Sequence, residues 1–369
     1  MKFLANDSVI DTSAGAGKPA LDFIRGELGL SGTKEGCREG DCGACAVLIG
    51  ERHPDSTFTW KASPSCLLAL GELEDRQLVT IEGLVAGARA AGQPESLTPV
   101  MAALLAENGS QCGFCSPGVV ISLTAWLLSS PVLDEASAIT AVEGNLCRCT
   151  GYAAIRRAAA RLASQFAGLP REPRARLEAL VAAAVVPPSL LGFIKGELLP
   201  ATAAQATPTG PGSKAPGSGI PRLGGGTDYF VRNPDPEPGF SPALLDLDPG
   251  LSRIHPGPQG LELGAAVTIR DFFESPLVRS LVPGIEAFEA EFASSLIRSR
   301  ATLGGNVANA SPVGDLTSML LALGAICDIA GGPSARAIPL CGLYLGYKKL
   351  ALGEGEYIAR FRISPPARG

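Results

Sequence analysis

The chain has 369 residues, of which 46% are hydrophobic, and its formal net charge is −5. This length suffices for two to four domains with buried cores, whereas the acidic balance argues against nucleic acid as a partner. No apolar run approaches the roughly 18 residues that a membrane-spanning helix needs. Asp7 stands where a secretion signal would be apolar, so we expect a cytoplasmic protein.

Four cysteines near the N-terminus have the spacing CxxxxCxxC with a fourth further on, which is typical of plant-type 2Fe-2S ferredoxins. They are Cys37, Cys42, Cys45 and Cys66. Gly36, Gly40 and Gly43 should adopt positive φ and turn backbone N–H groups toward the sulfur atoms. A helical pattern before this loop and an apolar strand after it predict a β-grasp ferredoxin domain at residues 1–80.

A second quartet of cysteines has CxxC and CxC spacing and adjoins helical patterns. Its members are Cys112, Cys115, Cys147 and Cys149. Helices are expected over residues 97–106, 118–128, 136–142 and 151–166, which together predict a four-helix domain at residues 81–166. Ser116 should cap the second of these helices and Thr150 the last. Two clusters in one chain would form an electron relay.

Other uses of these cysteines fit less well. A structural zinc site usually has two CxxC pairs about 15 to 20 residues apart, and neither quartet has that form. Disulfides would require a secreted chain. His53 and His255 are too few and too distant for a Rieske pair or a three-histidine metal site, and we expect both at the surface. Cys327 and Cys341 lie outside both quartets and are assigned no role.

Prolines mark a change of composition after residue 166. Residues 167–190 are predicted to be a linker with one amphipathic stretch, and a new domain is predicted at residues 191–335. A Pro-, Gly- and Ser-rich tract at 207–219 indicates a flexible surface loop. The sequence RLGGGTDYF follows, and its three glycines let backbone amides approach a diphosphate with no side chain in the way.

A second glycine loop strengthens this interpretation. Residues 304–306 read GGN, and residues 311–315 form another polar turn before an apolar helix. Two such loops suit one phosphate-bearing ligand. Simpler roles stay open, since Asp315 could cap the helix and Phe292 could belong to the core. Arg298 and Arg300 could form a solvated charged face.

These motifs resemble those of the molybdenum hydroxylases, the family of xanthine dehydrogenase and aldehyde oxidase. GTKEGCREGDCGAC and SQCGFCSPG with NLCRCTGY are similar to the two cluster motifs of that family and occur in its order. The resemblance implies that the first quartet holds an outer cluster and the second a cluster nearer molybdenum. The implied fold class is α+β and multidomain, with a vanillyl-alcohol-oxidase-type FAD-binding domain after the two cluster domains.

In that family the glycine loops line FAD. The resemblance implies that Leu223 to Asp228 and Gly304 to Asn306 line the diphosphate and ribityl chain, to which Thr302 donates. It also implies that Asp315 bonds polar groups of the flavin, and that Phe292 and Ile358 contact the isoalloxazine. The full set of FAD-binding residues expected in this way is Arg222, Leu223, Gly224, Gly225, Gly226, Thr227, Asp228, Tyr229, Phe292, Thr302, Gly304, Gly305, Asn306, Ser311, Asp315 and Ile358.

The resemblance also implies a function. Substrate would be oxidised at a molybdenum pterin site on a large partner subunit, and electrons would pass through the two clusters to FAD and then as hydride to NAD. We therefore expect the iron–sulfur and FAD subunit of a xanthine dehydrogenase that converts hypoxanthine and xanthine to urate, with no catalytic residue of its own assigned. Alternatives are the same subunit of an enzyme for aldehydes or N-heteroaromatic substrates, or an electron carrier without flavin. Residues 336–369 resemble only the start of the C-terminal flavin subdomain, so a truncated chain is expected.

Overall fold

The computed structural model describes residues 1–53, 55–200 and 221–365, and the chain divides into two compact units. Unit 1 contains the described part of Met1–Ala206 together with Pro234–Gly239 and Ser295–Ile297, and unit 2 contains the described remainder. The tract at 207–219, for which the sequence predicts a flexible loop, lies outside the described residues.

Unit 1 begins with a five-stranded sheet in the order β2-β1-β5-β3-β4. Its strands are β1 (Lys2–Ala5), β2 (Ser8–Asp11), β3 (Ala46–Arg52), β4 (Phe58–Pro64) and β5 (Gln77–Val79). Strands β1 and β5 run parallel and the other neighbours antiparallel. Helix α1 (Ala20–Asp22) continues into a π-helical turn, Phe23–Glu27, whose Phe23 and Ile24 are buried with Phe3 and Val47. A mixed sheet packed against one helix confirms the predicted β-grasp fold.

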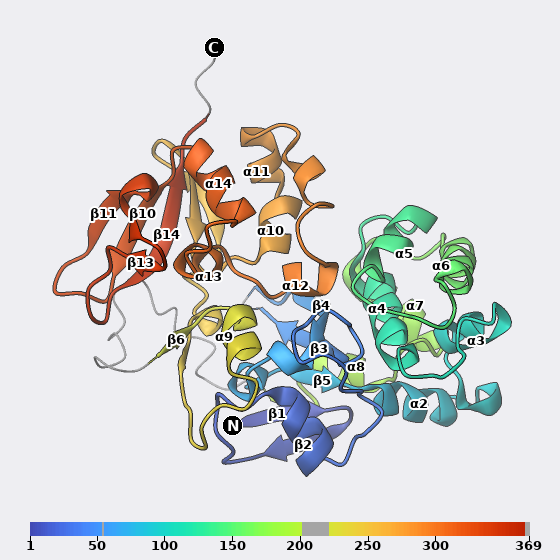
Figure 1. Cartoon of the computed structure of the whole chain (residues 1–369). Coiled ribbons are helices and arrows are strands. Elements are labelled where there is room, and N and C mark those ends of the chain that lie inside the picture. The colour runs from blue at the N-terminus through green and yellow to red at the C-terminus, as the bar shows by residue number, and fades with distance from the viewer. Residues whose placement is uncertain (54, 201–220, 366–369) are drawn as a thin grey trace. The chain divides into compact units, whose positions relative to one another are not determined.

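The helical part of unit 1 follows the sheet in the chain (Figure 1). Its helices are α2 (Ile81–Ala90), α3 (Pro99–Ala106), α4 (Ser116–Ser129), α5 (Glu135–Ala141) and α6 (Ala153–Gln165). The last four confirm the predicted four-helix arrangement, to which α2 is added. Residues 118–128 of α4 are all buried, so this helix forms the centre of the group.

The two predicted helix caps are wrong by one and two positions. Helix α4 has Cys115 as its N-cap, and Ser116 is its first residue. Helix α6 is preceded by Tyr152, which has a left-handed conformation with φ of 67°. The Thr150 hydroxyl lies 3.1 Å from the Cys147 sulfur and accepts a hydrogen bond from the Tyr152 N–H instead of capping the helix. Thr150, which N-cap preference would place at the start of the helix, therefore takes part in the hydrogen bonding of the cysteine loop instead.

The segment predicted as a linker contains α7 (Pro173–Ala182) and leads into α8 (Ser189–Ile194). Leu177, Leu180 and Phe193 are buried in the same hydrophobic core as α4. Arg52 from β3 donates to the carbonyl oxygens of Phe193 and Leu199 at 3.3 and 2.7 Å. These contacts hold residues 173–200 against the sheet and helices of unit 1.

Unit 2 is built on a second five-stranded sheet, in the order β11-β10-β14-β9-β8, with all neighbours antiparallel. Its strands are β8 (Ile254–Gly257), β9 (Gly260–Gly264), β10 (Ile326–Ala330), β11 (Arg336–Pro339) and β14 (Tyr357–Ile363). Two short pairs accompany it, the parallel β6 (Arg222–Leu223) with β7 (Ala243–Leu244), and the antiparallel β12 (Tyr344–Gly346) with β13 (Lys349–Leu350).

Short helices accompany this sheet. They are α9 (Thr227–Arg232), α10 (Ile269–Glu274), α11 (Pro276–Leu281), α13 (Leu303–Ala308) and α14 (Asp315–Ala322), and α12 (Ser295–Arg298) precedes α13 in the chain. Helix α11 contacts β8 and β9, and α13 contacts β14 (Figure 1). The prediction of a second glycine loop is wrong, because Gly304, Gly305 and Asn306 lie in the first turns of α13. The contact of α13 with β14 places these glycines beside that strand.

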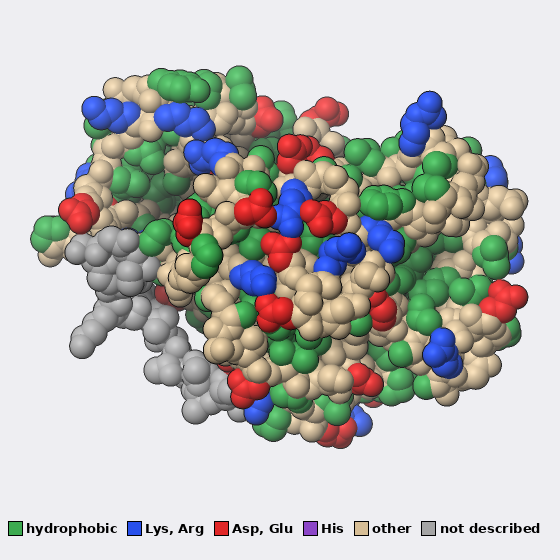
Figure 2. All heavy atoms as spheres, turned by 60° about the horizontal axis from the view of Figure 1, so that its bottom comes forward, with side chains coloured by type: hydrophobic (Ala, Val, Ile, Leu, Met, Phe, Trp, Pro, Cys, Tyr) green, Lys and Arg blue, Asp and Glu red, His purple; other side chains and the backbone are tan. Residues whose placement is uncertain are grey.

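Charged side chains of both signs are spread over the surface. Figure 2 shows Lys and Arg side chains interspersed with Asp and Glu side chains on one face of the chain. His255 is exposed and His53 is half-buried; of the two cysteines outside the quartets, Cys327 is buried and Cys341 is exposed. Among the helices of the described residues, none combines the length and apolar character needed to cross a membrane.

Candidate functional site

The first cysteine quartet is brought together by the loop before β3 and the turn after β4. The Sγ atoms of Cys45 and Cys66 lie 3.3 Å apart, and the Cys42 thiol is hydrogen-bonded with Cys37. The four sulfur atoms therefore form two neighbouring pairs. The hydrogen bond from Cys66 lowers the pKa of the buried Cys45 thiol to about 7. A lowered pKa favours the thiolate, which is the form that binds metal.

Glycines of this loop act in two different ways. Gly40 and Gly43 have φ of +78° and +64°, as predicted, and the Gly40 backbone is hydrogen-bonded to the Cys66 sulfur. Gly36 does not have positive φ, so that part of the prediction is wrong. A Cβ atom at Gly36 would lie 2.8 Å from the Cys42 sulfur. Gly36 is needed for close approach of the backbone to sulfur rather than for a left-handed conformation.

The second quartet also forms two pairs. The Sγ atoms of Cys112 and Cys149 lie 3.6 Å apart at the surface, whereas the buried Cys115 is hydrogen-bonded with Cys147. Three large apolar side chains beside these cysteines are exposed, namely Phe114, Leu146 and Tyr152. One pair of sulfur atoms thus faces solvent inside an apolar rim, while the other faces the helical core.

The pairing of sulfur atoms fits a cluster of two irons. Two thiolates on one tetrahedral metal with bonds of about 2.3 Å lie about 3.8 Å apart, close to the separations of Cys45 from Cys66 and of Cys112 from Cys149. A 2Fe-2S cluster is held by four cysteine thiolates, two on each iron. Within residues 1–53, 55–200 and 221–365, no group of three or more His, Cys, Asp or Glu side chains is close enough for one shared metal ion.

The two cysteine loops are hydrogen-bonded to each other. The Leu146 N–H donates to the Cys42 carbonyl at 3.0 Å, and the Asn145 side-chain amide donates to the Gly43 carbonyl at 3.1 Å. Asn145 is 1% exposed. A Cβ atom at Gly118, in the first turn of α4, would lie 2.1 Å from the Gly43 oxygen. Leu146, the residue before Cys147, is therefore hydrogen-bonded directly to Cys42 of the first quartet.

We predict that Gly43→Ala lowers the stability of unit 1 strongly. Its φ of +64° is unfavourable for alanine, and the new Cβ would lie 2.4 Å from the Gly144 carbonyl oxygen. Together these effects should cost about 2 to 4 kcal/mol, measured by thermal unfolding followed by circular dichroism. Gly92→Ala is the matched control, because Gly92 has φ of +69° with nothing within 4 Å. Equal losses of stability for the two variants would show that the two cysteine loops are loosely packed against each other at Gly43.

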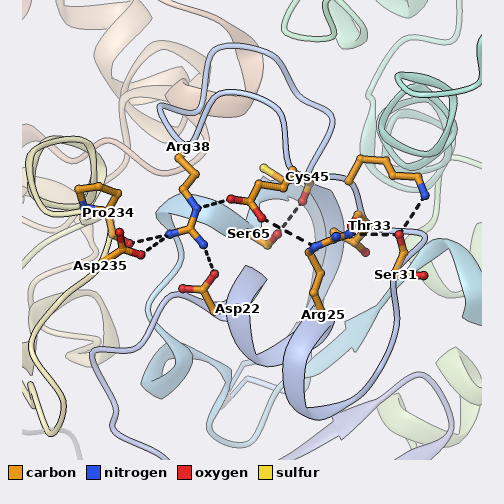
Figure 3. A network of polar contacts seen from close by, with 11 residues as sticks. Asp22, Arg25, Ser31, Thr33, Arg38, Cys45, Ser65, Pro234 and Asp235 are labelled. Atoms are coloured by element: carbon orange, nitrogen blue, oxygen red, sulfur yellow. Dashed lines mark hydrogen bonds and ion pairs between the residues drawn. The ribbon is translucent and has the colours of Figure 1, made fainter.

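A network of ion pairs holds the loop around Cys37 (Figure 3). Arg38 donates to Glu35 at 2.6 Å and to Asp235 at 2.9 Å, and also pairs with Asp22. Burial raises the pKa of the Asp22 carboxyl, and Arg38 opposes that rise. Arg25 fastens the same loop by donating to the Thr33 carbonyl at 2.8 Å. The backbone on both sides of Cys37 is thereby fixed.

Unit 2 contains a cavity of about 440 Å³ lined by glycines of the 224–226 loop and of α13. Six residues from the predicted FAD set line it, namely Arg222, Gly224, Thr302, Gly304, Gly305 and Ile358. Close packing explains two of the glycines. A Cβ atom at Gly224 would lie 2.5 Å from the Thr302 hydroxyl, and one at Gly304 would lie 2.9 Å from the Ala265 carbonyl oxygen.

Other residues from the predicted set lie outside the cavity wall. Gly226 precedes α9 with φ of 72°, Asp228 pairs with Arg232, and Tyr229 stacks on Phe240 with ring centroids 4.8 Å apart. The remaining residues of the glycine loop that do not line the cavity are Leu223, Gly225 and Thr227.

The second polar turn also lies outside the cavity wall. The Ser311 hydroxyl accepts a hydrogen bond from the Val313 N–H at 3.4 Å. Asp315 is the first residue of α14, whose N-cap is Gly314, so Asp315 is not the cap. Asn306 has a buried side-chain oxygen with no hydrogen-bond partner among the described residues. Asn306 directly follows two glycines that line the cavity. Its side-chain oxygen and the glycine backbone suit a ligand that carries polar groups.

Two arginines correct the expectations for residues 298–300, and Phe292 lies in the core position that the sequence left open. Arg298 and Arg300 are 2% and 4% exposed, so the interpretation as a solvated face is wrong. Arg298 donates to the Phe292 carbonyl at 2.9 Å, and Arg300 donates to the Gly225 carbonyl. The Phe292 ring is buried and lies 6.1 Å from the ring of Phe273. A guanidinium can be buried in this way because backbone carbonyls satisfy its donors.

Several cavity residues were not predicted from the sequence. Ala265 and Ala266 follow β9, Tyr357 begins β14, and the connection from β13 to β14 contributes Leu352, Glu354, Gly355 and Glu356. The Arg222 guanidinium lies over the Tyr357 ring at 5.2 Å. Glu356 accepts from Arg336 at 2.6 Å, a bond that lowers the pKa of its carboxyl to about 2. The glycines on either side of Glu354 are the only local signal that this connection approaches a ligand.

Three family models match the chain in the order of these features. The model for a 2Fe-2S iron-sulfur cluster binding domain matches residues 5–69, and the [2Fe-2S] binding domain matches residues 80–160. The model described as the FAD binding domain in molybdopterin dehydrogenase matches residues 213–366. Both cysteine quartets and the described cavity fall inside the matched ranges.

Curated relatives include xanthine dehydrogenases. That of Emericella nidulans is 41% identical over 133 residues, which cover 36% of this chain and 9% of that protein. The xanthine dehydrogenase/oxidase of Rattus norvegicus is 27% identical over 414 residues, covering 98% of this chain and 30% of that protein. This chain thus spans less than a third of the length of these relatives.

Solved structures with partial similarity come from the same group of enzymes. Quinoline 2-oxidoreductase from Pseudomonas putida 86 is 26% identical, covering 40% of this chain and 52% of that chain, with a TM-score of 0.37. Aldehyde oxidoreductase from Desulfovibrio gigas is 28% identical, covering 53% of this chain and 21% of that chain, with a TM-score of 0.38. The three domain matches and the xanthine dehydrogenase relatives agree, and the chain belongs to the molybdenum hydroxylase family, with two 2Fe-2S clusters and FAD as its cofactors.

Proposed function

We propose that the chain is the electron-transfer and FAD-binding subunit of a xanthine dehydrogenase. The molybdenum pterin site and the purine substrate would belong to a large partner subunit, and NAD would be the final acceptor. The observation that carries this proposal is the direct hydrogen bonding of the two cysteine loops to each other. A connection of this kind is what a relay requires, whereas two independent structural metal sites would not need it.

The cluster ligands in this proposal are the two quartets. Cys37, Cys42, Cys45 and Cys66 hold one cluster, and Cys112, Cys115, Cys147 and Cys149 hold the other. When bound, the clusters carry single electrons and FAD exchanges either one or two. The protein holds the two cluster loops together through the hydrogen bond from the N–H of Leu146, the residue before Cys147, to the Cys42 carbonyl. The exposed Cys112 and Cys149 make the second quartet the one that faces the partner.

The FAD site in this proposal is the cavity of unit 2. On the resemblance, Leu223 to Asp228 and Gly304 to Asn306 would line the diphosphate and ribityl chain, and Thr302 would donate to it. The Thr302 hydroxyl is positioned by its hydrogen bond from the Gly305 N–H at 3.1 Å. Ile358 lines the cavity at the start of β14 and would contact the flavin ring. Phe292, Ser311 and Asp315 are retained as flavin-contacting residues on the resemblance alone.

A second candidate is the same subunit of a molybdenum hydroxylase for aldehydes or N-heteroaromatic compounds. It is favoured by aldehyde oxidase 2 of Rattus norvegicus, which is 41% identical to this chain over 133 residues. The flavin-less alternative is disfavoured by the FAD-domain match over residues 213–366. Thiolate-bound clusters favour a reducing compartment, and we propose the cytoplasm.

Co-purification tests the function. The tagged chain should bring down a molybdenum-containing polypeptide, and the complex should reduce NAD with hypoxanthine as substrate. Reduction with quinoline or an aldehyde, but not with hypoxanthine, would support the second candidate. Absence of any molybdenum-containing partner would contradict both.

A further inference from the structure

The glycine loop of the cavity is fastened from its buried side by an arginine. Arg300 is 4% exposed. Its Nε and Nη2 atoms donate to the Gly225 carbonyl oxygen at 3.2 and 2.7 Å. Because two N–H groups of one rigid guanidinium converge on a single oxygen, they fix the direction of this carbonyl as well as its position.

The backbone of the same segment presses against the loop. A Cβ atom at Gly225 would lie 1.7 Å from the Arg300 carbonyl oxygen. Thr302, two residues after Arg300, is equally close to the loop, because a Cβ atom at Gly224 would lie 2.5 Å from its hydroxyl. The same hydroxyl accepts a hydrogen bond from the Gly305 N–H at 3.1 Å. Gly224, Thr302 and Gly305 all line the cavity. Arg300 therefore begins a series of contacts that ends in the cavity wall.

Peptide geometry gives this contact a chemical consequence. The described residues contain no cis peptide bond, so the N–H of Gly226 points opposite to the carbonyl of Gly225. Since Arg300 draws that carbonyl toward the protein interior, the N–H is directed away from the arginine. Backbone N–H groups held in this way are suited to an anionic ligand such as a diphosphate.

We propose that Arg300 is a positioning residue for the diphosphate of FAD. It orients the glycine loop through the Gly225 carbonyl, and the proposal requires no contact between Arg300 and the ligand. The inference rests on the flavin site proposed above. It predicts selectivity, because Arg300 should matter for a flavin that carries the diphosphate and should matter little for riboflavin, which lacks it.

The test compares two conservative variants of buried arginines. Arg300→Lys keeps the positive charge but loses the fork that holds the Gly225 carbonyl. Arg298→Lys is the matched control, because Arg298 is likewise buried, at 2% exposed, and donates to the carbonyls of Phe292 and Ala293. Each chain is stripped of flavin, and its affinities for FAD and riboflavin are measured by fluorescence quenching, with iron content as a check on unit 1.

We expect Arg300→Lys to raise the Kd for FAD about 10- to 100-fold and the Kd for riboflavin less than about threefold. Any loss of affinity in Arg298→Lys should be the same for FAD and for riboflavin. Equal losses for FAD and riboflavin in Arg300→Lys, or unchanged FAD affinity, would overturn the inference and leave the flavin site intact. If the unaltered chain does not bind FAD, the proposed site fails and the inference fails with it.

Discussion

Replacing Cys149 with serine should abolish one of two 2Fe-2S electron-paramagnetic resonance signals and leave the other unchanged. Cys149 is exposed, and its sulfur lies 3.6 Å from that of Cys112. Removal of this thiolate takes one of the four ligands from the second cluster. The first quartet lies on separate loops and keeps all four of its thiols, so iron content should fall by about half.

Cys341→Ser is the matched control for this experiment. Cys341 is also exposed but stands outside both quartets, and its replacement should leave both signals and the iron content unchanged. Cys37→Ser should give the complementary result, with loss of the other signal. Loss of both signals in Cys149→Ser would contradict two separate clusters.

Replacing Gly225 with valine should strip the chain of FAD. A Cβ atom at this position would lie 1.7 Å from the Arg300 carbonyl oxygen, which is backbone and cannot swing away. The glycine loop must therefore move by more than a bond length, which should weaken FAD binding at least about 100-fold. Flavin absorbance of the purified chain, divided by its iron content, measures the loss.

The control for Gly225→Val is Gly342→Val in the same unit. Gly342 has nothing within 4 Å of a built Cβ atom, so its valine variant should keep its flavin. Iron content should be unaffected in both variants, because both cysteine quartets belong to unit 1. Full flavin occupancy in Gly225→Val would show that the three glycines form only a turn.

The sequence predicted the cluster domains well because their ligands are encoded locally. Cysteine spacing specifies which sulfur atoms a loop can bring together, and the structure brings Cys45 to Cys66 and Cys112 to Cys149. Periodicity predicted the helices at 99–106 and 116–129 to within two residues at each end. The caps failed because Thr150 is recruited by the Cys147 sulfur, a contact that helix propensity does not contain.

The cavity was less predictable for a different reason, and six of its sixteen lining residues were in the predicted set. Ala265 and Tyr357 approach the ligand through the pairing of β9 with β14, where Gly264 lies opposite Arg360. Sheet register is a long-range property, and neither residue carries a motif. Arg300 was misjudged because charge alone suggests solvent, whereas the Gly225 carbonyl lets its guanidinium be buried.

The most direct test of the account is a cofactor count on the chain purified without oxygen. Two 2Fe-2S clusters and one flavin predict about four irons, about four acid-labile sulfides and one FAD per chain, with two distinct paramagnetic signals after reduction. A colourless chain without acid-labile sulfide, or one that holds zinc in place of iron, would contradict it.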